Sequence, residues 1–181
     1  MIIYVGRMAA EKNLAQAVEA FLAMQTLEPR AKFVLVGDGP EKASLAAKYP
    51  QFHYAGMRRG EELAVHYASA DAFVFASVTE TFGNVVTEAL ASGLVVVAYD
   101  YAATRQHVRD GLNGYAAAFG DKDALLAAAR KAMTRRAQWT AIREEGRATA
   151  LTITWDAIID KFEEELASAV AGGVVAAAVS R

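Results

Sequence analysis

Hydrophobic residues along this chain gather in short unbroken runs, and the segments between the runs carry them every three or four residues. The clearest runs are Ile2–Val5, Phe33–Val36, Ala72–Ala76 and Leu94–Ala98. Because they do not alternate with polar residues, they predict strands that are buried on both faces, as in a parallel sheet. The segment Asn13–Gln25 has helical spacing. The alternation predicts an α/β fold, a doubly wound parallel sheet with helices on both faces.

The other expected elements are shorter. The pattern predicts a strand over Phe52–Ala55 and helices over Glu41–Lys48, Glu61–Ser69, Asn84–Ser92, about Arg105–Arg109, and Asp121–Arg135, with a last helix capped by Thr154. No internal repeat or low-complexity linker divides the chain. A single domain over 1–181 is therefore the simplest expectation, with 154–181 as its C-terminal helix and tail.

Composition and charge narrow the classes of function. The 181 residues include 19 basic and 21 acidic side chains, a net charge of −2, which argues against non-specific nucleic-acid or anionic-membrane binding. Without cysteine, disulfides and thiol catalysis are excluded. His53, His66 and His107 are too scattered to predict a metal site. The apolar stretch Ala167–Val179 is shorter than the roughly 20 residues of a membrane span. With no targeting segment visible, a cytoplasmic location is expected.

Two loops hold most of the chemically useful side chains. In open parallel sheets, ligands bind beyond the carboxyl ends of the strands, at the point where the strand order reverses. For the commonest strand order, that point lies between the first and fourth strands, so the loops Gly6–Lys12 and Ser77–Asn84 would meet there. The sequence therefore predicts a ligand site between these two loops.

The first loop suits a diphosphate. Gly6 lets the backbone approach a ligand closely, Arg7 offers a planar fork of donors, and Lys12 adds a mobile positive charge. Two such cations beside a strand-to-helix turn can hold a diphosphate without a metal ion. The alternative is a solvated loop in which Lys12 pairs with Glu11 or Glu41.

The second loop leads into a helix that suits both an anion and a sugar. Gly83 and Asn84 open the helix, and the first N–H groups of a helix bind anions. Glu80 precedes the helix, whereas Glu88 lies about one turn inside it. Carboxylates only accept hydrogen bonds and therefore suit sugar hydroxyls. One carboxylate would face the reacting end of the ligand and the other its middle. The alternative for Glu88 is an ordinary exposed helix residue.

Four motifs occur in an order that is characteristic of a known family. They are Gly6-Arg7 with Glu11-Lys12-Asn13, Val36–Pro40, Tyr67–Val74, and Glu80 with Glu88–Gly93. In this order they resemble the C-terminal domain of retaining glycosyltransferases of the GT-B fold, a group that includes sucrose synthase and bacterial mannosyl- and glucosyltransferases. The pair Glu80 and Glu88 matches the E-x7-E motif of that family. The resemblance covers about residues 2–115 and the helix that contains Trp155.

The resemblance implies a domain that binds a UDP- or GDP-linked sugar as the donor of a hexosyltransferase. Arg7 and Lys12 would hold the diphosphate and Glu80 the sugar hydroxyls, and these three are the implied catalytic residues. Glu88 would accept from the ribose, and the loop with Met57 and Arg58 would pack the base. The full set of implied donor-binding residues is Gly6, Arg7, Lys12, Met57, Arg58, Glu80, Phe82, Gly83, Asn84 and Glu88. Neither a metal ion nor a further cofactor is implied.

The chain also departs from the family. Leu94 stands where a proline is frequent, and Ala102-Ala103 with Gln106 replaces a usual Gly-Gly-x-x-Glu pattern, so these residues are assigned no role. The family pairs this domain with an N-terminal acceptor-binding domain that is missing here. The isolated chain is therefore expected to bind the donor without transferring the sugar. Membrane association, peripheral at the inner face, is expected only through the missing half. The alternatives are half of a sugar-nucleotide epimerase and a non-catalytic nucleotide-sugar-binding module.

Overall fold

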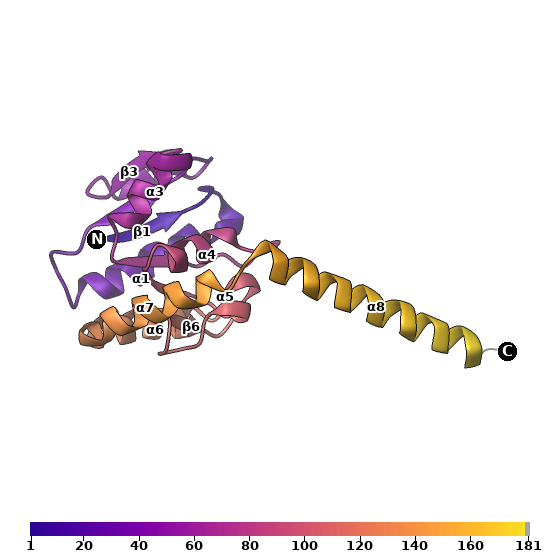
Figure 1. Ribbon diagram of the computed structural model, residues 1–181. Helices are drawn as coiled ribbons and strands as arrows, with labels where there is room; N and C mark the ends of the chain where they lie inside the picture. The colour runs from indigo at the N-terminus through magenta and orange to yellow at the C-terminus, as the bar shows by residue number, and fades with distance from the viewer. Residues whose placement is uncertain (180–181) are drawn as a thin grey trace. The chain divides into compact units, whose positions relative to one another are not determined.

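The chain folds around a six-stranded parallel sheet (Figure 1). The computed structural model describes the backbone of residues 1–179 and the side chains of residues 1–170. The strand order is β3-β2-β1-β4-β5-β6. The strands are β1 (Ile2–Val5), β2 (Phe33–Val36), β3 (His53–Gly56), β4 (Ala72–Phe75), β5 (Val95–Tyr99) and β6 (Tyr115–Ala117).

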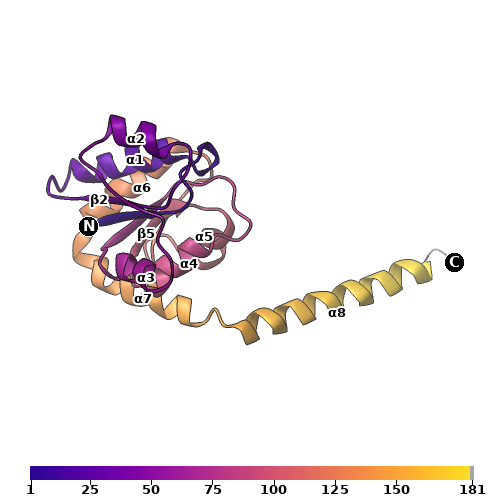
Figure 2. The ribbon, with the colours of Figure 1, turned by 90° about the horizontal axis from the view of Figure 1, so that it is seen from above.

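Helices cover both faces of this sheet, which confirms the doubly wound fold. Figure 2 shows α1, α2 and α6 on one face and α3, α4, α5 and α7 on the other. The helices are α1 (Leu14–Gln25), α2 (Lys42–Lys48), α3 (Gly60–Ala68), α4 (Asn84–Ala91), α5 (Ala102–His107), α6 (Lys122–Thr134), α7 (Trp139–Leu151) and α8 (Trp155–Val179), with 3₁₀ turns η1 (Ala10–Lys12) and η2 (Arg136–Gln138).

The strand order reverses between β1 and β4, as the sequence predicts. Ile2 in β1 is level with Phe33 of β2 on one side and with Ala72 of β4 on the other. After the edge strand β3, the chain crosses through α3 and returns beside β1. The loops that follow β1 and β4 therefore leave the sheet next to each other, at its carboxyl end.

The core explains why the strands read as unbroken apolar runs. All residues of β1, β2, β4 and β5 are buried, whereas the edge strand β3 is partly exposed. Next to β2, the rings of Phe21 and Phe33 stack with centroids 4.6 Å apart, and Phe52 meets Phe21 edge-on at 5.3 Å. A rigid sheet of this kind holds the loops at its end in fixed positions.

Two elements were not predicted from the sequence. β6 is only three residues long, and α7 mixes polar and apolar residues, of which Trp139, Ile142 and Gly146 are buried. α5 begins at Ala102, earlier than expected, and its first residue has a φ of 48°. Asp121, the first residue of the helix expected over Asp121–Arg135, is the N-cap of α6, and its Oδ1 accepts from the backbone N–H of Ala124 at 3.0 Å.

The chain divides into two compact units, Met1–Ala150 and Leu151–Arg181. In the second unit, Thr154 Oγ1 accepts from the N–H of Ala157 at 3.2 Å, which confirms the predicted cap of α8. The side chains of Trp155, Ile158 and Phe162 on this helix are exposed. Within the part of the chain that the structure describes, every helix is too short or too polar to cross a membrane.

Candidate functional site

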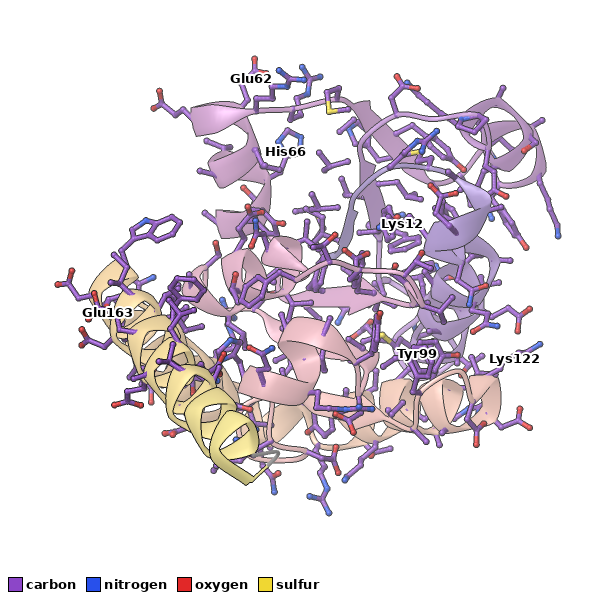
Figure 3. The ribbon with its side chains drawn as sticks, turned by 90° about the vertical axis from the view of Figure 1, so that its right-hand side faces the viewer. Lys12, Glu62, His66, Tyr99, Lys122 and Glu163 are labelled. Atoms are coloured by element: carbon purple, nitrogen blue, oxygen red, sulfur yellow. The ribbon has the colours of Figure 1, made fainter. Side chains whose placement is uncertain are left out.

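Lys12 and Glu80 meet at the point where the strand order reverses. Lys12 ends the 3₁₀ turn after β1, and Glu80 lies in the loop after β4 (Lys12 is labelled in Figure 3). Lys12 Nζ donates to Glu80 Oε1 at 2.6 Å and to the carbonyl oxygen of Thr79 at 3.0 Å. The two side chains are only 20% and 15% exposed. The alternative pairing of Lys12 with Glu11 or Glu41 is therefore wrong.

Backbone geometry brings Lys12 to this position. Asn13 adopts the left-handed conformation, with a φ of 57°, and its N–H bonds to the carbonyl of Ala10 at 3.0 Å. The left-handed residue ends the 3₁₀ turn and starts α1, a conformation that asparagine tolerates better than most residues. A second link joins the loops, because Thr79 Oγ1 donates to the carbonyl of Glu11 at 3.0 Å. The two loops thus form one connected surface.

Glycines pack the strand ends beneath these loops. The N–H of Gly6 donates to Val36 at 3.0 Å, and the N–H of Gly37 donates to Gly56 at 2.9 Å. A Cβ on Gly37 would lie 1.9 Å from the carbonyl oxygen of Gly6, so no side chain fits there. A Cβ on Gly6 would lie 3.0 Å from the hydroxyl of Tyr4. Close packing therefore requires glycine at position 37, and the backbone conformation and tight packing favour it at position 6; contact of Gly6 with a ligand stays a prediction.

Arg7 extends into solvent beside the ion pair. Its guanidinium is 65% exposed and lies 3.1 Å from Glu11 Oε1. The buried hydroxyl of Tyr4 donates to the carbonyl of Arg7 at 2.9 Å. Burial, and after it the negative charges of Glu80 and Glu11, raise the pKa of Tyr4, so its hydroxyl stays protonated and keeps this loop in place. Arg7 therefore combines a backbone held by Tyr4 with an exposed guanidinium that pairs with Glu11.

The N-terminus of α4 opens next to Glu80. Gly83 precedes the helix with a φ of 93°, and no side chain caps the first turn. A Cβ on Gly83 would lie 3.8 Å from Glu80 Cγ and 3.5 Å from Ala103 Cβ. The carbonyl of Phe82 accepts from the N–H of Ala103 at 2.8 Å, which ties this loop to α5. Asn84, the first residue of α4, is exposed. The predicted Phe82, Gly83 and Asn84 thus frame one helix end.

Glu88 lies one turn into α4, with its side chain exposed. It is nevertheless held in place, because the hydroxyl of Tyr67 on α3 donates to its Oε2 at 2.8 Å. Tyr67 itself is 2% exposed. Tyr67 belongs to one of the four motifs, but a role for it was not predicted, because the pattern along the chain does not show that its hydroxyl reaches Glu88.

Met57 and Arg58 follow β3 at the same end of the sheet. Met57 is 56% exposed, and Arg58 lies 3.5 Å from Glu62 on α3. Two strands separate β3 from β4, and Figure 3 shows Glu62 and His66 on α3 apart from Lys12. The structure therefore brings Lys12 and Glu80 together, whereas a role of Met57 and Arg58 in packing the base stays a prediction.

The arrangement suits an anionic ligand that also carries hydroxyl groups. Lys12, Arg7 and the uncapped start of α4 offer positive charge and N–H donors, while Glu80 and Glu88 offer acceptors. Among the side chains that the structure describes, no three His, Asp or Glu residues gather as a metal ion would require.

Comparisons with known proteins identify the family of this chain. The family model described as "Glycosyl transferases group 1" matches residues 1–135. The chain is 34% identical over 158 residues to the GDP-mannose-dependent alpha-mannosyltransferase of Mycobacterium tuberculosis, which covers 87% of this chain and 40% of that protein. It spans less than half the length of the curated relatives that it matches, 30% and 40% in two of them.

Solved structures show the same fold. The pneumococcal O-GlcNAc transferase GtfA in complex with UDP and GlcNAc matches with a TM-score of 0.75 at 22% identity, over 93% of this chain and 35% of that one. The C-terminal domain of a glycosyl transferase group 1 family protein, LpcC from Francisella tularensis, matches with a TM-score of 0.73 at 22% identity. That match covers 84% of this chain and 85% of the solved domain.

Proposed function

Because the chain belongs to the glycosyl transferases group 1 family, we propose that it is the C-terminal, donor-binding domain of a retaining glycosyltransferase of two domains. The donor would be a hexose linked to UDP or GDP. The similar proteins support both nucleotides, since one relative is named for GDP-mannose and one solved neighbour holds UDP. The match to an isolated C-terminal domain over 85% of its length supports the domain assignment.

The observation that carries the proposal is the Lys12–Glu80 pair beside the open end of α4. Lys12 and Arg7 would hold the diphosphate, and Glu80, next to the start of the helix, would accept from the hydroxyls of the transferred sugar. Glu88, one turn further along α4, would accept from the ribose. The E-x7-E pair would thus bind the two sugar rings of one donor, on either side of the phosphates.

The same groups account for the chemistry of transfer. As the bond between the anomeric carbon and the diphosphate oxygen breaks, negative charge develops on the leaving nucleoside diphosphate. Lys12, Arg7 and the N–H groups of α4 would stabilise that charge. Stabilisation of developing charge by preorganised groups is usually the largest single contribution to catalysis. The acceptor hydroxyl oxygen forms the new bond to the anomeric carbon, and its proton passes to the leaving diphosphate. The anomeric configuration is retained.

Acceptor binding would require the rest of the protein. The chain spans 40% of the mycobacterial mannosyltransferase, so a further domain of comparable size is expected in the whole enzyme. We therefore expect the isolated chain to bind the donor but to transfer the sugar negligibly. A product assay on the full-length protein would separate a transferase from an epimerase and from a non-catalytic binding module.

Titration calorimetry of the chain with UDP, GDP and their hexose conjugates tests the proposal. We expect heat of binding with one nucleotide family. Lys12→Ala should weaken that binding, whereas Lys32→Ala, which removes the same charge from an exposed position just before β2, serves as the matched control. If none of the four ligands bound at about millimolar concentration, any affinity would be far weaker than specific recognition requires, and the proposal would be contradicted. Rapid transfer by the isolated chain would contradict the need for a second domain.

A further inference from the structure

We propose that Tyr67 is a positioning residue that fixes the carboxylate of Glu88 for recognition of the ribose. This inference rests on the proposed function, which assigns the ribose to Glu88. Nothing in the site described above requires the buried phenol of Tyr67. Its hydroxyl nevertheless reaches Glu88 Oε2 at 2.8 Å, from a helix 21 residues earlier in the chain.

The ring of Tyr67 is held firmly. It is the one buried residue of α3, with 2% of its surface exposed. The ring of Phe73 on β4 lies against it, with centroids 6.4 Å apart and the planes tilted by 53°. A ring packed between a helix and the sheet has little freedom, so the direction of its hydroxyl is set by the fold.

The hydroxyl acts as a donor toward Glu88. A buried tyrosine hydroxyl normally finds a hydrogen-bond partner. Of its two acceptors, Glu88 Oε2 at 2.8 Å is closer than the carbonyl of Val85 at 3.4 Å. Burial, and then the charge of Glu88, raise the pKa of Tyr67, so the proton stays on the phenol at neutral pH. The bond is therefore charge-assisted, and such bonds are the stronger class.

The consequence for the ligand is preorganisation. An exposed glutamate on a helix has many rotamers, and a ligand that selects one of them binds more weakly as a result. The bond from Tyr67 restricts Glu88 before the ligand arrives. A carboxylate has about four lone-pair sites, so one bond from Tyr67 leaves acceptor capacity for both ribose hydroxyls.

Tyr67→Phe is the direct test, because it keeps the ring and its packing and removes only the hydroxyl. Binding is measured by calorimetry with UDP and GDP and with their 2′,3′-dideoxy analogues, which lack the hydroxyls that Glu88 would accept. We expect Tyr67→Phe to weaken the ribonucleotide by about three- to tenfold. Binding of the dideoxy analogue should not change. In a Glu88→Ala background, Tyr67→Phe should have no further effect on the ribonucleotide.

Tyr54→Phe is the matched control, since its hydroxyl bonds to the carbonyls of Leu45 and Tyr49 and not to the site. A purely structural role for Tyr67 would weaken both nucleotides alike and would overturn the proposal, as would an unchanged affinity for the ribonucleotide. Only a positioning role predicts that Tyr67→Phe reduces the preference for the ribonucleotide over its dideoxy analogue. If the wild-type chain binds the nucleotide but does not distinguish ribose from dideoxyribose, the ribose role of Glu88 is wrong and this inference falls with it. If the wild-type chain binds neither nucleotide, the proposed function itself is wrong.

Discussion

The ammonium group of Lys12 lies 2.6 Å from the carboxylate of Glu80, although the two residues are 68 positions apart in the chain. Each would contact a different part of the donor, the lysine its diphosphate and the glutamate its sugar. Before the donor arrives, the two charges compensate each other at a site that is largely shielded from solvent. A diphosphate that bound Lys12 would compete with Glu80 for its ammonium group, and this competition would couple the two halves of donor recognition.

Glu80→Gln should have opposite effects on the two forms of the ligand. With the charge of Glu80 removed, Lys12 is free for the phosphates. The affinity for UDP or GDP should then rise by about two- to fivefold, which corresponds to the free energy of a partly exposed ion pair. The affinity for the nucleotide sugar should fall, because a strong acceptor for the sugar hydroxyls is lost. Titration calorimetry of the variant with both ligands measures the two dissociation constants.

Glu144→Gln removes an exposed carboxylate from α7 and controls for the change in net charge. Equal weakening of the free nucleotide and of its sugar conjugate by Glu80→Gln would show that the orientation assigned to the donor is reversed or wrong. From the sequence alone, the free nucleotide would be expected to bind Glu80→Gln unchanged. The ion pair in the structure is what alters that expectation.

The sequence predicted the neighbourhood of Lys12 but not its partner. Unbroken apolar runs identify the strands and their order along the chain. The commonest order of such strands in a sheet then predicts which loops meet. Which of Glu11, Glu41 and Glu80 pairs with Lys12 depends on the left-handed turn at Asn13 and on the direction of the lysine side chain. For the same reason Tyr67, which lies on a helix between two loops, was not connected with Glu88. Patterns along the chain do not carry that information.

Arg7→Ala and Lys12→Ala should both weaken nucleotide binding, and Lys12→Ala should do so more. Each lost charge-assisted bond to phosphate corresponds to about 1.5–3 kcal/mol, or about ten- to hundredfold in affinity. Lys12 is fixed near Glu80, whereas Arg7 is 65% exposed and must be ordered by the ligand, which reduces its contribution. Calorimetry with UDP or GDP measures which of the two variants loses more affinity.

The stability of the two variants separates binding from folding. Arg7→Ala should change the free energy of unfolding by less than about 0.5 kcal/mol, as is usual for an exposed side chain. Lys12→Ala should destabilise slightly more, because it leaves Glu80 without its partner at a shielded position. Unchanged affinity in both variants would place the diphosphate elsewhere on the protein.

The limits of the fold prediction also have physical causes. β6 has only three residues, too few to show a pattern, and its position depends on pairing with β5. α7 mixes polar and apolar residues, and only Trp139, Ile142 and Gly146 of it are buried. A Cβ on Gly146 would lie 3.1 Å from Leu90 Cδ2 on α4, so α7 packs closely against α4 at this point. Tertiary packing, and not local preference, determines these elements.

Gly37→Ala should destabilise the first unit strongly. A Cβ at this position would lie 1.9 Å from the backbone oxygen of Gly6, and the φ of 140° is itself unfavourable for alanine. We expect a loss of about 2–5 kcal/mol in the free energy of unfolding, from the clash and the backbone together. Chemical denaturation followed by circular dichroism measures the difference.

Gly60→Ala is the control for conformation without a clash. Gly60 has a φ of 52°, yet nothing lies within 4 Å of a Cβ placed there. Its substitution should therefore cost only the backbone term, about 1–2 kcal/mol. If both variants lost the same stability, the close approach of Gly6 and Gly37 would not be a determinant of the fold, and the loop that carries Arg7 and Lys12 would be positioned by other contacts.

Glu28 should make part of the stability depend on pH in the acid range. Its carboxylate accepts hydrogen bonds from Arg30 and, at 2.8 Å, from Arg136, and these bonds, those of Arg30 first, lower the pKa of Glu28 from 4.5 to about 2. Because the folded value lies below the unfolded one, the stabilisation is complete above about pH 4.5 and is lost as the pH falls toward 2. Glu28→Gln should therefore lower the melting temperature at pH 7, and the difference from the wild type should shrink between pH 4.5 and about 2. Thermal melts across this range check it, with Glu144→Gln as the matched change of charge. A difference that stays constant down to pH 2 would mean that Glu28 stabilises the fold through packing and not through its charge.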